Sequence, residues 1–211
     1  QSKLFSSSST LFNNTQPNTH IHSIDVALPG TLPLMNEQAI VQGVKTSLAL
    51  NGNVQHYSQF DRKHYFYRDM PQGYQITQQF HPLMINGRFN DIGIARLQIE
   101  QDSGKSNHIQ EQQQQQEQHT LVDLNRAGIG LMEIVTQPDF HSTEQVEDFL
   151  KKLQFLLRHI GTCHANMEQG NMRCDVNVSV ALKDSCELGT RCEIKNLISV
   201  NYIVKAIDSE I

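Results

Sequence analysis

Three short segments of this chain alternate apolar and polar residues with a period of two, and this pattern constrains the fold most strongly. They are ARLQIEQD (Ala95–Asp102), DVNVSVAL (Asp175–Leu182) and RCEIK (Arg191–Lys195). Successive side chains of a strand point to opposite faces, so each segment predicts a β-strand with one apolar and one polar face. We therefore expect a mostly antiparallel sheet with one functional, polar face.

Two segments with helical periodicity accompany these strands. Ser142–Ile160 carries apolar residues three and four apart, starts with Ser142 and Gln145 in capping-box spacing, and stops before Gly161. A second helix is expected after Asn36, a suitable N-cap. Its apolar face would comprise Ala39, Ile40, Val44, Leu48 and Ala49. Packed helices together with an antiparallel sheet predict an α+β fold.

Composition excludes several classes of protein. The 211 residues have ordinary apolar content and a formal charge of −5, which indicates a globular chain without a general attraction for nucleic acid. No apolar segment reaches membrane-spanning length, so no membrane partner is expected. Irregular cysteine spacing argues against both a zinc module and a disulfide framework, and favours a reducing compartment. The four cysteines are Cys163, Cys174, Cys186 and Cys192.

Several regions are expected to lack regular structure. The segment KLFSSSSTLFNNTQPNTH near the N-terminus has the composition of a loop. The polar tract QEQQQQQEQH, residues 110–119, has no side chains for a core and predicts a disordered insertion. Because the chain begins with Gln1 and stops at Ile211 within a predicted helix, we expect it to be a fragment of a longer protein.

The apolar run GLMEIV, residues 130–135, contains one carboxylate, Glu133. A run of this length between glycines and a Thr-Gln-Pro segment is typical of a strand buried on both faces. An ionised carboxylate there would cost on the order of several kcal/mol unless it is paired, protonated or bound to a metal. Glu133 is therefore predicted to have a specific partner.

Four carboxylates lie on predicted strands, and three of them share a polar face with other polar side chains. They are Glu100, Glu133, Asp175 and Glu193. Carboxylates gathered on one face repel each other unless cations intervene, and Mg²⁺ takes oxygen ligands and brings nucleotide phosphates with it. The pattern leaves two interpretations open: a metal–nucleotide site, or solvated strand faces.

Two glycine motifs fail as nucleotide-binding signals. DSGKS, residues 102–106, lacks the first glycine of a P-loop because that position is Ile99. The segment is either an exposed turn or a turn that presents Lys105 and backbone N–H groups to phosphate. AGIG, residues 127–130, has neither the third glycine nor the strand–turn–helix order of a dinucleotide site.

Seven blocks, in order, resemble the B subunit of the aspartyl/glutamyl-tRNA amidotransferases. They are PNT (17–19), LPGTLPLMN (28–36), SQFDRKHYFYRDMPQGYQIT (58–77), LQIEQDSGKSNH (97–108), DLNRAGIGLMEIVTQPD (123–139), MEQGNMRCDVNVSV (167–180) and GTRCEIKN (189–196). They extend over nearly the whole chain outside the glutamine tract. An ordered set of this kind is far more specific than any single motif.

The resemblance implies a reaction, a fold and partners. Such proteins use ATP and Mg²⁺ to phosphorylate the side-chain carboxylate of glutamate misacylated on tRNA(Gln), or of aspartate on the corresponding tRNA. Ammonia released from glutamine by the amidase (the A subunit) then displaces phosphate, and a small C subunit completes the complex. The implied fold is glutamine synthetase-like, with residues 1–211 forming part of the catalytic domain and the C-terminal helical and tail domains absent. The implied location is the mitochondrial matrix, or the cytoplasm if the source is bacterial.

The resemblance also implies roles for individual residues. Mg²⁺ ligands would be Glu100 and Glu133; catalytic residues would be Glu133, Glu193 and Lys195. Nucleotide-binding positions would be Lys63, Lys105, Asp175 and Asn196. For Lys63, Arg126 and Arg173, contacts with phosphate or tRNA and structural ion pairs are equally expected.

The chain departs from the family pattern at several positions. The Glu-x-His strand that precedes the block at Lys3 in the family is absent from this sequence. The alternative function is therefore a non-catalytic scaffold that binds the amidase or tRNA. Zinc-binding cysteine pairs of some members are replaced, so no zinc is predicted; these positions are Ser6, Ser8, His22 and Asp25. Arg68 and Gly130 stand where proline is usual, and Gly130 is expected to loosen the strand that carries Glu133.

Overall fold

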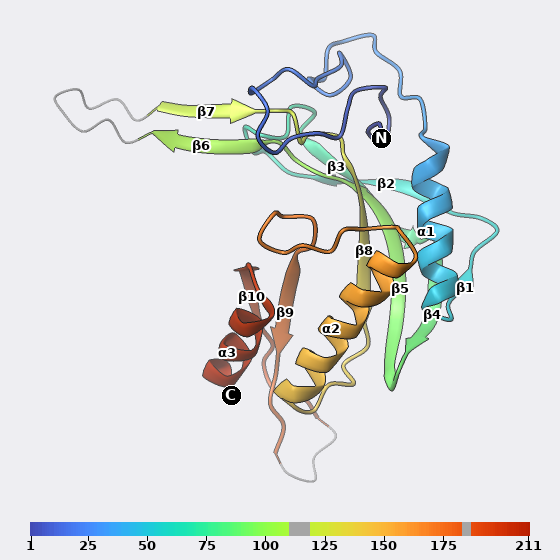
Figure 1. Ribbon diagram of the computed structural model, residues 1–211, viewed down its shortest axis with the longest axis vertical. Helices are drawn as coiled ribbons and strands as arrows, with labels where there is room; N and C mark the ends of the chain where they lie inside the picture. Colours follow the sequence, from blue (N-terminus) through green and yellow to red (C-terminus); the bar gives the residue numbers. More distant parts are fainter. Residues whose placement is uncertain (110–118, 183–186) are drawn as a thin grey trace, which may run out of the picture. The chain divides into compact units, whose positions relative to one another are not determined.

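A computed structural model describes residues 1–109, 119–182 and 187–211 (Figure 1). It divides into two compact units. Unit 1 comprises Gln1–Gly87 and Ile94–Thr136, and unit 2 comprises Arg88–Gly93 and Gln137–Ile211. The predicted insertion at residues 110–119 falls largely outside the described residues, but His119 begins a strand.

Unit 1 is built on a four-stranded sheet with the order β1-β4-β5-β8. Its strands are β1 (Asn53–Val54), β4 (Met84–Phe89), β5 (Ile92–Gln101) and β8 (Gly130–Thr136). The last residues of β4 and the first residues of β5 belong to unit 2. β5 and β8 pair antiparallel, with Gln98 opposite Glu133 and Glu100 opposite Leu131. The β5 strand was predicted from its alternation, and the fold is α+β as expected.

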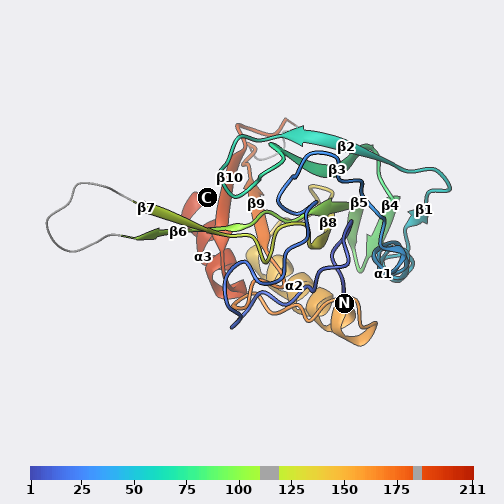
Figure 2. The ribbon, with the colours of Figure 1, turned by 90° about the horizontal axis from the view of Figure 1, so that it is seen from above.

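Two antiparallel hairpins complete unit 1. The first joins β2 (Gln59–His64) to β3 (Tyr74–His81), and the second joins β6 (Lys105–Ile109) to β7 (His119–Asp123). Both views show β6 and β7 extending away from the four-stranded sheet (Figures 1 and 2). The side chain of Gln78 on β3 accepts a hydrogen bond from the backbone N–H of Ile99, 3.0 Å, and so links the first hairpin to β5.

Helix α1 (Glu37–Ala49) begins as predicted, because the Asn36 side chain accepts a hydrogen bond from the N–H of Gln38. Its buried face was predicted in part: Leu48 is 63 % exposed and the other four expected residues are half-buried, whereas Gly43, Thr46 and Ser47 are buried. A Cβ at Gly43 would lie 2.5 Å from Leu83 and 3.3 Å from Ile99. Small residues on this face let the helix approach the sheet closely.

The N-terminal segment, expected to be a loop, supplies two fully buried residues, Lys3 and Leu4. The ammonium of Lys3 lies 3.1 Å from the Asp25 carboxylate, and the Ser6 hydroxyl donates to the same carboxylate. Burial lowers the pKa of Lys3, and the charge of Asp25 opposes that change. Gly128 (φ +84°) borders this pair, because a Cβ there would lie 2.8 Å from Asp25 Oδ1.

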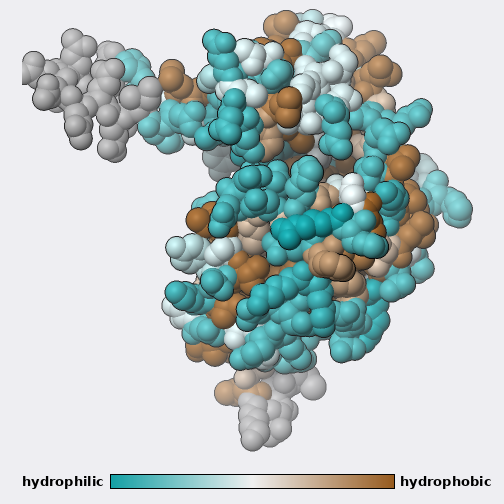
Figure 3. Space-filling model, viewed as in Figure 1, coloured by the Kyte–Doolittle hydropathy of each residue, from teal (hydrophilic) through white to brown (hydrophobic). Residues whose placement is uncertain are grey.

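Unit 2 contains α2 (Thr143–His159), α3 (Val200–Glu210) and the antiparallel pair β9 (Cys174–Val178) and β10 (Cys192–Leu197). α2 matches the predicted helix closely: the Ser142 side chain caps it by accepting from the N–H of Gln145, and Gly161 follows with φ +70°. Its buried residues all belong to the predicted apolar stripe: Phe149, Leu150, Leu153 and Leu157. Figure 3 shows hydrophilic side chains over much of the visible face of the molecule, interrupted by smaller hydrophobic areas.

Candidate functional site

The candidate site lies in unit 1, where the side chains of Glu100 and Glu133 meet on adjacent strands. Glu100 is near the end of β5, and Glu133 is in the middle of β8, the strand at one end of the four-stranded sheet. Glu133 is exposed and its neighbours in β8 are half-buried, so the prediction that this strand is buried on both faces was wrong. β8 is the last strand of this sheet and pairs with β5 on one side, so no described strand of the sheet covers its other side.

The Glu100 carboxylate accepts hydrogen bonds from three side chains. The Thr77 hydroxyl donates to Oε1 at 2.6 Å, and the Gln98 amide donates to the same oxygen at 2.9 Å. The Gln75 amide donates to Oε2 at 3.3 Å. Thr77 and Gln75 come from β3, so two non-consecutive strands hold the carboxylate in place.

Gln98 joins the two carboxylates. Its amide nitrogen donates to Glu100 and to Oε2 of Glu133, while its oxygen accepts from Arg96 Nε at 2.9 Å. Gln98 is buried, with 3 % of its surface exposed, so this amide has few other orientations. The bridge keeps two acidic side chains close together although both are acceptors when ionised.

Proximity to Glu100 changes the acidity of Glu133. Partial removal from water raises the pKa of Glu133, and the charge of Glu100 and a hydrogen bond with it raise that pKa further. Arg96 and Lys63 oppose the change by lowering it. Two carboxylates in one site cannot ionise independently, which is the behaviour expected of a site for a cation or a proton.

Lys63 is the predicted nucleotide-binding residue that the fold brings to this site. It lies on β2 opposite Gln75 of β3, which itself contacts Glu100. A hydrogen bond with Tyr65 raises the pKa of Lys63, and the charges of Glu100 and Glu133 raise it further. Partial burial lowers this pKa but does not outweigh these effects. Lys63 therefore stays positively charged beside the carboxylate pair.

The donor set of this pair suits Mg²⁺. In the described ranges no group of three or more His, Cys, Asp or Glu side chains is arranged to hold a metal ion. Mg²⁺ in nucleotide sites commonly takes one or two carboxylates and completes its shell with water and phosphate oxygens, and the pair of Glu100 and Glu133 matches that number of carboxylates. A divalent cation would also relieve the repulsion that raises the pKa of Glu133.

The raised pKa predicts how stability depends on pH. In the folded chain Glu133 binds a proton more readily than in the unfolded chain, so its contribution to stability falls as pH rises through the interval between the two pKa values. We expect Glu133→Gln to raise the melting temperature by about 1–2 °C at about pH 8, and the gain to vanish at about pH 4. Thermal melts followed by circular dichroism over this range would measure it.

Glu168→Gln, at an exposed carboxylate of unit 2, is the matched control and should change the melting temperature equally little at every pH. A loss of stability in Glu133→Gln at about pH 8 would contradict the repulsion between Glu100 and Glu133.

Lys105 occupies a different position. It is exposed on β6, where it pairs with Asp123 of β7. In the preceding turn the N–H of Ser103 donates to the Asp102 carboxylate, and the N–H of Gly104 donates to the carbonyl of Asp69. These two backbone groups already have partners within the chain.

Arg126 supports the same turn. Its guanidinium donates to the carbonyls of Ser103 and Gly104 and lies 3.4 Å from the Asp102 carboxylate. This geometry matches the structural ion pair, which is one of the two roles expected for Arg126.

The remaining predicted site residues belong to unit 2. Glu193 of β10 lies opposite Asn177 of β9, and Lys195 forms an ion pair with Glu193 at 3.4 Å. Asp175, Glu193 and Lys195 are exposed, on the polar face predicted for these strands. The alternation thus identified these exposed residues, but Cys192, which it placed on the apolar face of its strand, is exposed as well.

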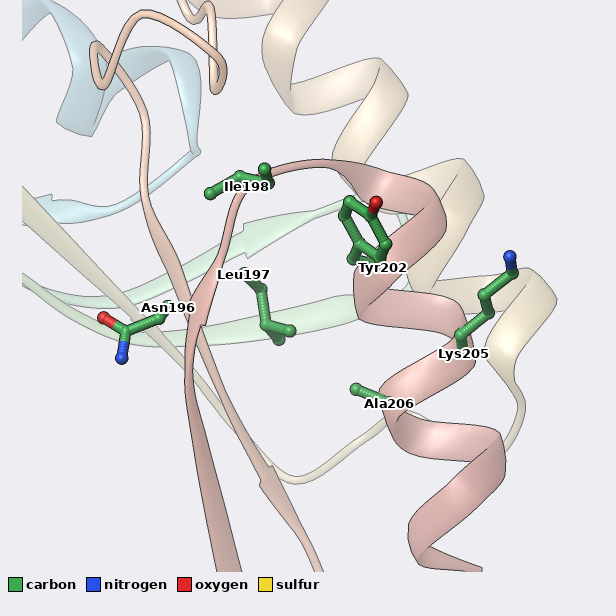
Figure 4. A pocket seen from close by; sticks show the side chains of 6 residues that line it. All are labelled: Asn196, Leu197, Ile198, Tyr202, Lys205 and Ala206. Carbon is green, nitrogen blue, oxygen red and sulfur yellow. The ribbon is translucent and has the colours of Figure 1, made fainter.

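Asn196 lies where the pairing of β10 with β9 becomes irregular, and its backbone has φ +63°. It lines a pocket beside the first turns of α3 (Figure 4). The pocket residues are Asn196, Leu197, Ile198, Tyr202, Lys205 and Ala206.

Sequence reasoning missed three residues that support the carboxylate pair: Gln75, Thr77 and Arg96. Gln75 and Thr77 alternate with Ile76 in YQIT, so a period-two analysis of that block would have predicted β3 and its polar face. In β5, Arg96, Gln98 and Glu100 likewise alternate with apolar residues. Which of these side chains meet could not be deduced, because β3 and β5 belong to different sheets.

None of the helices in the described part of the chain is both long and apolar enough to cross a membrane.

Comparisons with known proteins agree on one family. A relative from Naegleria gruberi, the mitochondrial B subunit of a glutamyl-tRNA(Gln) amidotransferase, is 54 % identical over 100 % of this chain and 43 % of its own length. The B subunit of the aspartyl/glutamyl-tRNA(Asn/Gln) amidotransferase of Wolbachia pipientis wMel is 54 % identical over 99 % of this chain and 44 % of its own. The protein of the same name from Rickettsia rickettsii strain Sheila Smith is 50 % identical over 100 % of this chain and 44 % of its own.

The chain thus spans less than half the length of these curated relatives. The family described as "GatB/GatE catalytic domain" matches residues 1–211, and the chain belongs to this family.

Proposed function

We propose that this chain is part of a tRNA-dependent amidotransferase, and that Glu100 and Glu133 form its site for activating a carboxylate with ATP. The substrate would be glutamate misacylated on tRNA(Gln), and the product Gln-tRNA(Gln). The observation that carries the proposal is the pair itself: two carboxylates joined by Gln98, with the pKa of Glu133 raised and the positive Lys63 beside them. The names of the relatives supply the substrate class.

The chemistry explains why such a site is needed. A carboxylate is a poor acceptor for ammonia, because oxide would have to leave. In the proposed first step an oxygen of the substrate carboxylate attacks the γ-phosphorus of ATP, and ADP leaves. In the second step ammonia attacks the acyl carbon, phosphate leaves with the bonding electrons, and the nitrogen loses a proton to give the amide. Phosphoryl transfer of this kind depends mainly on positioning and charge compensation.

The residues of unit 1 would divide these tasks. Glu100 and Glu133 would hold Mg²⁺, which when bound supplies positive charge to the transferred phosphoryl group. Thr77, Gln75 and Gln98 would keep the Glu100 carboxylate in one orientation through their hydrogen bonds. Lys63 would add a second positive charge for a phosphate oxygen.

The proposal also assigns roles to residues of unit 2 and to Lys105 of the β6–β7 hairpin. By resemblance to the family, Lys195 and Glu193 would have catalytic roles, and Asp175, Asn196 and Lys105 would have nucleotide-binding roles. The proposed partners are the amidase (A) subunit, which releases ammonia from glutamine, a small C subunit and the misacylated tRNA. The proposed location is the mitochondrial matrix, by analogy with the Naegleria relative.

The decisive experiment is an amidation assay, in which Glu100→Gln and Glu133→Gln should each reduce product formation about 100-fold or more. Each substitution removes a negative charge while keeping the size of the side chain. Because the chain spans 43 % of its Naegleria relative, the assay would use the full-length protein with both partner proteins, ATP, Mg²⁺, glutamine and Glu-tRNA(Gln). Conversion to Gln-tRNA(Gln) is measured, with Asp208→Asn, at an exposed position of α3 outside the seven blocks, as the control.

The alternative, a scaffold that binds the amidase or tRNA without turnover, predicts a different outcome. Both substituted proteins would then match the unsubstituted one in amidation, and calorimetric titration with MgCl₂ would give the same signal for all three. Full activity in Glu133→Gln would by itself exclude this residue as an essential metal ligand.

A further inference from the structure

Arg96 lies on the same face of β5 as Gln98 and Glu100. The three residues are two apart in the strand, and alternate residues of a strand share a face. In the pairing of β5 with its neighbour β8, Gln98 lies opposite Glu133 and Arg96 opposite Val135 (Figure 1). Arg96 is half-buried, and its positive charge lowers the pKa of Glu133. The candidate site thus contains an arginine to which the proposed function assigns no task.

The amide of Gln98 has two chemically different ends, because its nitrogen can only donate and its oxygen can only accept. The nitrogen donates to the Thr77 hydroxyl at 3.1 Å, to Glu100 Oε1 at 2.9 Å and to Glu133 Oε2. Within the described residues the oxygen has one donor, Nε of Arg96 at 2.9 Å. Acceptors therefore surround one end of the amide, and a cation contacts the other.

This arrangement disfavours the reversed orientation of the amide. Rotation by half a turn would set the amide oxygen against both carboxylates and the amide N–H groups against the guanidinium, so that acceptors would face acceptors and donors would face donors. Gln98 is 3 % exposed, so water has little access to a polar atom that loses its partner. Arg96 therefore helps to hold the amide with its N–H groups towards Glu100 and Glu133.

We propose that Arg96 is a positioning residue, which orients the Gln98 amide and thereby keeps Glu100 and Glu133 in the geometry that binds a divalent cation. The inference rests on the proposed function, since it concerns the metal site assigned there to the two carboxylates. Hydrogen-bond partners of ligating carboxylates orient the ligands, and their loss commonly weakens metal binding by about 10- to 100-fold. Arg96 lies one contact further out and acts through such a partner.

The positive charge of Arg96 by itself would have the opposite effect on a bound metal. A positive charge near a cation site repels the cation, so removal of a residue that acts through charge alone would strengthen metal binding. Removal of a residue that acts through the hydrogen bond to Gln98 would weaken metal binding. The two roles therefore differ in the sign of their effect.

Two neutral substitutions of Arg96 separate the hydrogen bond from the charge. Arg96→Gln keeps an N–H donor at the same number of bonds from Cα as Nε of arginine, whereas Arg96→Met has a methyl group there. Both substitutions remove the positive charge. Arg96→Met should raise the Kd for Mn²⁺ about ten-fold, and Arg96→Gln should keep this Kd within about three-fold of that of the unsubstituted protein.

The measurement is the concentration of free Mn²⁺, followed by electron paramagnetic resonance while the full-length protein in complex with both partner proteins is titrated with MnCl₂. Mn²⁺ suits the same oxygen ligands as Mg²⁺. Binding that is lost in Glu100→Gln defines the site. The matched control is Arg88→Met, which removes an exposed arginine of β4 and should leave the Kd unchanged.

Amidation supplies a second reading of the same variants. Arg96→Met should need about ten times more Mg²⁺ for half of its maximal rate, and should reach the maximal rate of the unsubstituted protein at saturating Mg²⁺. A general loss of folded protein would instead lower the rate at every Mg²⁺ concentration. Arg96→Leu, which also lacks a donor, replaces Arg96→Met if circular dichroism shows that protein to be unfolded.

Gln98→Met tests whether Arg96 acts through the amide. This substitution alone should weaken Mn²⁺ binding about ten-fold, and adding Arg96→Met should cause no further loss, because the amide that Arg96 orients is already gone. A further ten-fold loss in the double variant would show that Arg96 acts by another route and would overturn the inference. Equal Kd values for Arg96→Met and Arg96→Gln would also overturn it, since the donor would then have no effect.

Failure of the proposed function would give a different result. If Glu100→Gln bound Mn²⁺ as the unsubstituted protein does, the two carboxylates would not form a metal site, and the proposed function would fail together with the inference. If Glu100→Gln lost this binding while Arg96→Met retained it, the carboxylate site would stand and only the role of Arg96 would be refuted.

Discussion

Replacing Asp25 by alanine should destabilise unit 1 by about 3–5 kcal/mol, because it leaves the Lys3 ammonium buried without its counter-charge. The Lys3 side chain is 0 % exposed and the Asp25 side chain 3 % exposed, so water cannot substitute for the lost carboxylate. The same carboxylate accepts from the Ser6 hydroxyl and from the N–H of His22. The free energy of unfolding from chemical denaturation measures the effect.

Two further variants separate loss of charge balance from loss of packing. Asp25→Asn combined with Lys3→Met removes both charges, and we expect it to recover most of the stability lost in Asp25→Ala. Asp208→Ala, at an exposed position of α3, should change stability by about 0.5 kcal/mol or less. If Asp25→Ala behaved like Asp208→Ala, the buried ion pair would not support unit 1.

In the Asp25→Ala protein the deficit should also depend on pH. The pKa of Lys3 is already lowered by burial in the folded chain, and loss of Asp25 removes the charge that opposes this change. A lysine whose folded pKa lies below its unfolded value destabilises the fold at low pH, and stability returns as pH rises from the folded towards the unfolded pKa. The deficit should therefore shrink as the solution approaches pH 10.5, the ordinary pKa of lysine.

Replacing Phe149 by alanine should destabilise unit 2 by about 3–5 kcal/mol, as large-to-small changes of a buried aromatic residue do. Phe149 is 5 % exposed on α2, and its ring contacts Phe140 and Phe89 edge to face, with centres 5.2 Å and 5.7 Å apart. The substitution removes apolar burial and both ring contacts, and leaves a cavity. Chemical denaturation again gives the free energy of unfolding.

The same helix provides the matched control for Phe149. Phe155→Ala changes the same residue type to the same residue, but Phe155 is 72 % exposed and should cost less than about 1 kcal/mol. Equal losses at the two positions would mean that α2 buries a different face. Asp25 and Phe149 belong to different units, so their effects should add within about 0.5 kcal/mol in a double variant.

The regular elements with local signals were predictable. α2 was predicted nearly residue by residue, because Ser142, Gly161 and the spacing of its apolar residues act within the helix itself. The β5, β9 and β10 strands were predicted from alternation alone. By contrast, β2 and β3 were not predicted, although Gln75 and Thr77 alternate with Ile76 in β3; these two polar residues face the carboxylate pair and not solvent.

The buried residues of the N-terminal segment could not have been predicted in the same way. Lys3 and Leu4 precede a run rich in serine, asparagine and threonine, whose composition is that of a loop. Their burial depends on Asp25 and on Gly128, whose carbonyl accepts from the N–H of Leu4. These partners are distant in sequence and become neighbours only when the chain folds.

The sequence by itself determined the family, the α+β class and the main helix, and it placed Glu100 and Glu133 on predicted strands. Each follows from residue type and spacing along the chain, which need no knowledge of distant contacts. Only the tertiary structure decided that β8 lies at the end of its sheet and that Gln98 joins the two acids, with Thr77 and Lys63 around them. The physical reason is that pairing between strands and packing between sheets determine which charges meet, and with them the raised pKa of Glu133.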